Sequence, residues 1–164
     1  MRGFSHQVII AKAVLAVAIV LAVGYSNVLA ADFYCVGDDG EAFYIPRDTL
    51  FSEVARQHNV PEHILRAIAR TESKFDPRAI HINKNGTFDF GLMQVNSSWY
   101  AVLGAKTWNR LDDPCVNVAV GASILADCMR SYGATWESVG CYNARSTDKR
   151  VLYVQKVMKN LRDN

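Results

Sequence analysis

The sequence predicts one α-rich domain of the α+β class with a small β element. Its 164 residues suit a single domain, and no segment repeats or is of low complexity. Apolar residues spaced four apart predict an amphipathic helix in the first half, where turn signals also separate short strand-like segments. Three further helical stretches are expected in the second half.

The first thirty residues are typical of a secretory signal peptide. Arg2 and Lys12 are its charged residues, an unbroken apolar run extends from Ala13 to Gly24, and small residues lead to a cleavage site at Ala30. A membrane span needs about 20 apolar residues, and this run is shorter. An uncleaved segment that anchors the protein in the membrane is therefore the less favoured alternative. We expect cleavage after Ala30 and a periplasmic mature chain, residues 31–164.

The predicted mature domain carries no net charge. The whole chain has 18 basic and 16 acidic residues, and two of the basic residues belong to the signal segment. A balanced charge argues against binding to nucleic acid, and no mature segment is apolar enough for stable membrane insertion. We expect a monomer.

The mature chain is expected to begin with a β-hairpin and then a helix. Residues 33–45 contain two short strands around a Gly-Asp-Asp-Gly turn at residues 37–40. Residues 49–58 form the first predicted helix.

A second predicted helix begins near Pro61. Proline is tolerated in a first helical turn, and the acid that follows, Glu62, suits the helix dipole. Ile64, Ile68 and Glu72 are spaced four apart and therefore share one face. A carboxylate ends this apolar row.

The next predicted element is a strand after a tight turn. Asn85-Gly86 is typical of a two-residue hairpin turn, and residues 87–91 then alternate strictly. Phe88 and Phe90 share one face, and Asp89 points to the other. Helices are then expected over residues 113–132, 136–143 and 148–162.

The four cysteines are expected to form two disulfides: Cys35, Cys115, Cys128 and Cys141. Their spacing lacks the close pairs of a structural zinc site, and export favours disulfides. Cys115 and Cys128 on one helix would lie about 20 Å apart, too far for a bond. Of the two remaining patterns we favour Cys35 with Cys115 and Cys128 with Cys141, because an antiparallel helix pair brings the latter two together.

Glu72 and Asp89 are the candidate catalytic carboxylates. Burial at the end of an apolar helix face disfavours the charged form of Glu72 and raises its pKa, and such pairs divide acid and base roles. The alternative is a structural acid, in which Glu72 is solvated or paired with Arg70 or Lys74.

Three motifs occur in order and carry a resemblance to a known family: Glu72-Ser73, Gly91-Leu92-Met93-Gln94 and Tyr142-Asn143-Ala144. Over residues 51–161 the chain resembles the small exported lytic transglycosylases of the lysozyme-like superfamily. Those enzymes accompany type III secretion, type IV pilus and conjugation machines. The resemblance implies a lysozyme-like fold for the mature chain, with residues 31–48 as an N-terminal hairpin addition.

The resemblance also implies a reaction and its residues. The substrate is the peptidoglycan glycan strand, cleaved between N-acetylmuramic acid and N-acetylglucosamine with a 1,6-anhydro product. Glu72 acts as general acid and then as base, without metal or cofactor. The implied substrate-binding residues are Ser73, Met93, Gln94, Tyr142 and Asn143. For Met93 and Tyr142 core packing is the alternative.

Asp89 departs from the pattern of many lytic transglycosylases. Animal-type lysozymes carry an aspartate before the corresponding glycine, and lysozyme is the standard example of this two-carboxylate chemistry. We expect Asp89 to assist catalysis, with a structural turn acid as the alternative. Two other functions stay open, a lysozyme-type hydrolase that uses Glu72 and Asp89, and a non-catalytic glycan-binding or assembly module.

Overall fold

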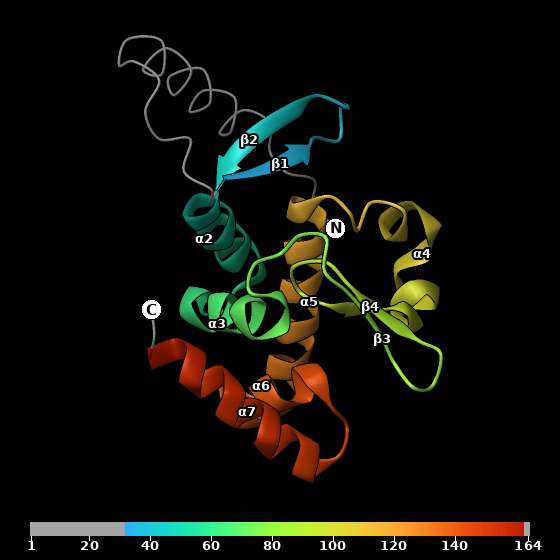
Figure 1. Cartoon of the computed structure of the whole chain (residues 1–164). Coiled ribbons are helices and arrows are strands. Elements are labelled where there is room, and N and C mark those ends of the chain that lie inside the picture. The colour runs from blue at the N-terminus through green and yellow to red at the C-terminus, as the bar shows by residue number, and fades with distance from the viewer. Residues whose placement is uncertain (1–31, 163–164) are drawn as a thin grey trace. The chain divides into compact units, whose positions relative to one another are not determined.

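A computed structural model describes residues 32–162, and the predicted signal peptide lies outside this range. The chain divides into two compact units, one ending at Arg47 and the other beginning at Asp48. Each unit is described by itself (Figure 1). No helix within residues 32–162 is long and apolar enough to cross a membrane.

The first unit holds the predicted N-terminal hairpin. Strand β1 (Asp32–Val36) pairs antiparallel with β2 (Ala42–Pro46). The connecting turn closes through a 2.8 Å hydrogen bond from the Gly37 amide to the Glu41 carbonyl, and Gly40 has a φ of +83°. A glycine is favoured there because L side chains rarely adopt this conformation.

The second unit is mainly helical, which confirms the predicted class. Its helices are α2 (Arg47–His58), α3 (Glu62–Ser73), α4 (Tyr100–Trp108), α5 (Pro114–Tyr132), α6 (Trp136–Asn143) and α7 (Thr147–Arg162). Its antiparallel sheet has the order β3 (Ile80–Ile82), β4 (Phe88–Phe90), β5 (Val95–Asn96), and a 3-10 turn, η1 (Ser97–Trp99), follows.

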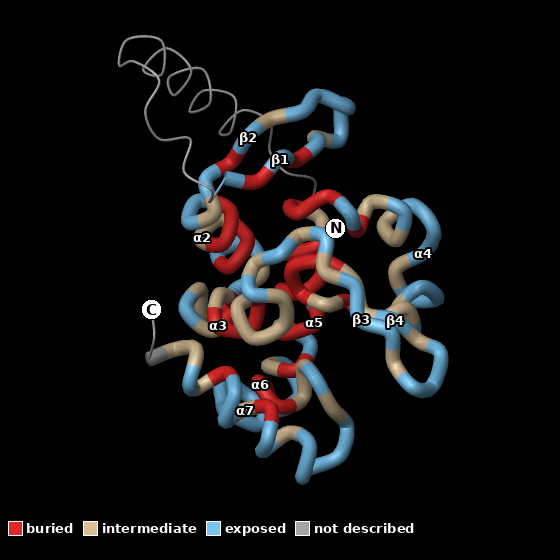
Figure 2. Tube along the Cα trace, in the orientation of Figure 1, coloured by how far each residue is buried: buried red, intermediate tan, exposed pale blue. Residues whose placement is uncertain are grey.

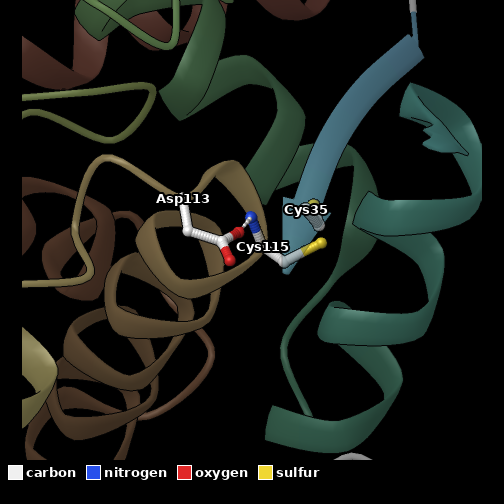
Figure 3. A group of neighbouring side chains, drawn as sticks. All are labelled: Cys35, Asp113 and Cys115. Atoms are coloured by element: carbon white, nitrogen blue, oxygen red, sulfur yellow. Dashed lines mark hydrogen bonds between the residues drawn. The ribbon is translucent and has the colours of Figure 1, made fainter. Parts of the chain in front are cut away.

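Helix α5 lies in the core of this unit. Figure 2 shows buried residues concentrated along it, among them Val118 and Leu125, which have no exposed surface. It packs against α6 and β5, and α7 packs against both α6 and α3. The helix begins where the Asp113 carboxylate accepts a 2.8 Å hydrogen bond from the Cys115 amide, an N-cap drawn in Figure 3.

A disulfide joins α5 to α6. It links Cys128 and Cys141, whose Cα atoms are 5.8 Å apart, and this is one of the two expected pairings. None of the described cysteines is free. The bond between Cys35 and Cys115 stays a prediction.

Helices α6 and α7 approach closely at Gly140. A Cβ on Gly140 would lie 2.6 Å from the Cβ of Arg150, so only glycine permits this spacing. The Arg150 guanidinium donates to the Ala144 carbonyl at 2.9 Å and to the Glu137 carboxylate at 2.5 Å. These contacts fix α7 beside α6.

Two features of the second unit differ from expectation. The β3–β4 connection spans residues 83–87 instead of a two-residue turn, and the Asn83 amide donates to the Thr87 carbonyl at 2.8 Å. Asn85 and Gly86 do lie within this connection, and Gly86 has a φ of +82°.

Helix α4 was not predicted, and Gly104 interrupts it with a φ of +73°.

Candidate active site

Glu72 lies at the C-terminal end of α3 and is half-buried. The helix ends because Lys74 adopts the left-handed conformation, with its amide bonded to the Arg70 carbonyl. The Tyr153 hydroxyl of α7 donates a 2.5 Å hydrogen bond to Glu72 Oε1. This hydrogen bond joins the end of α3 to α7.

The surroundings of Glu72 raise its pKa from 4.5 to about 7. Desolvation by burial is the largest cause, and the negative charge of Asp89 adds to it. The hydrogen bond from Tyr153 and the positive charge of Lys156 act in the opposite direction. Glu72 therefore holds its proton for a substantial fraction of the time at neutral pH.

Asp89 is held by two asparagine side chains. It lies on β4, opposite His81 of β3 and Asn96 of β5. Its Oδ1 accepts a hydrogen bond from Asn96 Nδ2 at 2.6 Å, and its Oδ2 accepts one from Asn83 Nδ2 at 2.9 Å. Each carboxylate oxygen thus has a donor that fixes its position.

The Gly91-Leu92-Met93-Gln94 motif forms the tight loop between β4 and β5. Gly91 has a φ of +76°, and a Cβ there would lie 2.2 Å from Asn117 Nδ2. The Asn117 amide group donates to the carbonyls of Phe90 (3.0 Å) and Leu111 (3.1 Å), and its Oδ1 accepts from the Met93 amide at 2.8 Å. The motif glycine is therefore required by the approach of Asn117.

Two of the predicted substrate-binding residues also hold this loop. The Ser73 hydroxyl donates to the Leu92 carbonyl at 2.9 Å, and the Tyr142 hydroxyl donates to the Met93 carbonyl at 2.8 Å. The ring of Tyr142 stacks on that of Tyr153, with centroids 6.5 Å apart. The side chains of Glu72, Tyr153 and Tyr142 and the motif loop thus form one connected cluster.

The other predicted substrate-binding residues differ in accessibility. Met93 has no exposed surface and packs where Gly121 leaves room. Its side chain is therefore part of the core, which was the alternative to substrate binding for this residue. Gln94 is half-buried, and its Nε2 donates to the carbonyls of Ala79 at 3.0 Å and Gly91 at 2.9 Å. Asn143 is exposed at the end of α6.

Sequence reasoning missed four residues of this arrangement: Asn83, Asn96, Asn117 and Tyr153. Tyr153 follows Glu72 by 81 residues, and no local pattern joins the two. Its one signal is the spacing of Tyr153 and Val157, both buried, which places them on the inward face of α7.

A carboxyl group with a pKa of about 7 at an accessible position is suited to proton transfer at neutral pH. A second carboxylate, Asp89, contributes a negative charge to the same region. This combination of a protonated acid and a fixed charge is the arrangement that glycoside cleavage requires.

Comparison with known families decides the class. The sequence profile described as "Transglycosylase SLT domain" matches residues 49–159. The chain belongs to the transglycosylase SLT domain family. It is therefore an enzyme of the lytic transglycosylase class with a mainly α-helical, lysozyme-like fold, and peptidoglycan fits as its substrate.

Several curated proteins are similar in sequence to this SLT-domain chain. "Invasion protein IagB" from Salmonella typhimurium is 42% identical over 117 residues, which cover 67% of this chain and 73% of the relative. "Protein IpgF" from Shigella sonnei is 34% identical over 110 residues, 65% of this chain and 72% of the relative. "X polypeptide" from Escherichia coli is 36% identical over 118 residues, 66% and 70% respectively.

Proposed function

We propose that this SLT-domain enzyme cleaves the β-1,4 bond between N-acetylmuramic acid and N-acetylglucosamine and leaves a 1,6-anhydro end. The observation that carries the proposal is the half-buried Glu72, with its pKa of about 7 and its oxygen bonded to Tyr153. A group of this kind both gives and accepts a proton near neutral pH.

In the first step Glu72 is the general acid. Its carboxyl proton passes to the bridging oxygen, the bond from this oxygen to C1 of the muramic acid breaks, and N-acetylglucosamine leaves with a 4-hydroxyl. Positive charge develops at C1 as the bond breaks. The negative charge of Asp89 stabilises this charge, and Asn83 and Asn96 keep the carboxylate in place.

In the second step the ionised Glu72 is the general base. It accepts the proton of the C6 hydroxyl of the same muramic acid residue, and O6 bonds to C1 to close the 1,6-anhydro ring. Glu72 is protonated again, and no water is consumed. Because both steps use one carboxyl group, a pKa near the working pH serves the whole cycle.

A lysozyme-type hydrolysis is the second candidate function. It is favoured by the two hydrogen bonds that orient Asp89, since a fixed carboxylate also suits a nucleophile or a stabiliser of a water-mediated reaction. Hydrolysis gives a reducing end in place of the anhydro ring.

The proposed setting is the periplasm, where the enzyme locally opens the cell wall for a secretion or pilus apparatus. The disulfide between Cys128 and Cys141 supports export to an oxidising compartment. The name of the relative "Invasion protein IagB" supports a link to a machine that crosses the envelope. We expect the mature enzyme to act as a monomer.

Mass spectrometry of muropeptides released by the mature enzyme tests the reaction. We expect 1,6-anhydro ends, which weigh one water less than reducing ends. Reducing ends would replace the proposal with hydrolysis. Glu72→Gln, which keeps the size of the side chain, is expected to abolish release. Release at the normal rate by this variant would remove Glu72 from its assigned role.

A further inference from the structure

Lys156 of α7 lies between two residues that contact the end of α3. Tyr153 precedes it by three positions and donates to Glu72, and Asn160 follows it by four and donates to Thr71 Oγ1 at 2.9 Å. Residues three and four apart are neighbours on a helix surface. Lys156 is therefore placed beside the face of α7 that meets α3.

Lys156 differs from its neighbours in exposure and in charge. Tyr153 and Val157 are buried, whereas Lys156 is exposed, so it lies at the solvent edge of the contact between α3 and α7. Its ammonium group acts on Glu72 electrostatically, and it has no ion-pair partner within the described part of the chain. An unpaired cation thus lies on the turns of α7 that contact Glu72 and Thr71 of α3.

The substrate of the proposed reaction carries a carboxylate close to the scissile bond. N-acetylmuramic acid has a lactyl ether on C3, which either ends in a carboxylate or continues into a stem peptide with carboxylates of its own. The bond that Glu72 cleaves leaves from C1 of this same sugar. A cation beside Glu72 is therefore near the substituent that distinguishes muramic acid from N-acetylglucosamine.

We propose that Lys156 is a specificity-determining residue, whose ammonium group binds a carboxylate on the lactyl or stem-peptide substituent of the muramic acid residue at the cleavage site. The inference rests on the proposed function and assigns its substrate preference. A lysine suits the task because its ammonium group is a mobile point charge with three donors. The contact favours acidic, muramic-acid-containing strands over neutral glycans.

Kinetics with Lys156→Met tests the proposal, because this change removes the charge and keeps much of the apolar stem. Three soluble strands are compared: strands with stem peptides, strands stripped to the lactyl carboxylate by an amidase, and strands with all carboxyl groups converted to methylamides. The first two are measured as substrates, and the third as a competitive inhibitor. Lys106→Met, at an exposed lysine of α4, is the matched control.

We expect Lys156→Met to raise KM for carboxylated strands by up to about fivefold, the upper end of the range for an exposed ion pair. The inhibition constant of the methylamide strands stays unchanged, and Lys156→Arg restores KM. Loss confined to peptide-bearing strands identifies a stem-peptide carboxylate, and loss confined to stripped strands identifies the lactyl carboxylate. Loss on both strands means that Lys156 binds whichever carboxylate the substituent carries. Lys106→Met behaves as the wild type.

Two results would overturn the role of Lys156. One is an unchanged KM for both carboxylated strands, and the other is an equal loss of affinity for the methylamide strands, which would indicate a structural effect. Failure of the proposed function is separate, because in that case the wild-type enzyme itself releases no fragments from peptidoglycan.

Discussion

Replacing Glu72 with glutamine is expected to stabilise the folded enzyme in alkaline but not in acidic solution. The folded-state pKa of Glu72 is raised to about 7 from 4.5, so the folded chain holds this proton more tightly than the unfolded chain does. The contribution of Glu72 to the free energy of unfolding is fully present below pH 4.5, and it is lost as the pH rises through 7. The amide of the variant never ionises, so it does not undergo this loss.

The size of the effect follows from the shift in pKa. The raised pKa lies about 2.5 units above 4.5, and each unit corresponds to about 1.4 kcal/mol, which gives an upper value of about 3.5 kcal/mol for the loss in the wild type. Tyr153 keeps an acceptor, since the amide oxygen replaces Oε1. We therefore expect Glu72→Gln to gain about 3 kcal/mol over the wild type between pH 4 and pH 8.

Urea denaturation of the disulfide-intact proteins at pH 4 and pH 8 measures this gain. Other titrating groups are common to both proteins and cancel in the difference. Glu53→Gln is the control, because Glu53 forms an exposed ion pair with Arg56 at 2.8 Å, for which we expect less than about 1 kcal/mol at either pH. The reasoning is refuted if the stability difference between Glu72→Gln and the wild type is the same at pH 4 and pH 8.

Three further changes test the site. Asp89→Asn is expected to lower turnover without abolishing it, measured by fragment release, and a loss as complete as that of Glu72→Gln would make the two carboxylates equal partners. Tyr153→Phe removes a bond that lowers the pKa of Glu72, so the alkaline limb of kcat/KM should move up by roughly one pH unit; a downward shift would contradict the assignment. Gly91→Ala should cost about 2 kcal/mol or more in a denaturation curve, from the left-handed backbone and the clash with Asn117, and a neutral effect would mean that the loop relaxes at no cost.

Helix positions were predictable where end signals and spacing coincide. The helix over residues 136–143 agrees with α6 at both ends, and the expected start near residue 113 falls on the N-cap of α5. Helix α4 was missed because Gly104 breaks the helical conformation within it, which divides the segment into pieces too short for a periodic signal.

The position of Glu72 at the end of a helix was predictable from sequence, and its surroundings were not. Glu72 stands at the end of an apolar row, which is a local pattern. The contacts with Tyr153 and Asn117 join segments far apart in the chain, and only the fold brings them together. The sequence motif also suggested that Met93 binds substrate, yet its side chain fills the core while its backbone bonds to Asn117.

The loop of residues 91–94 is held by one side chain from each of three helices: Ser73 of α3, Asn117 of α5 and Tyr142 of α6. Its order therefore depends on all three helices at once. A chain in which any one of these helices is unformed has no ordered 91–94 loop beside Glu72. Assembly of this part of the candidate site is therefore coupled to the folding of the whole helical unit.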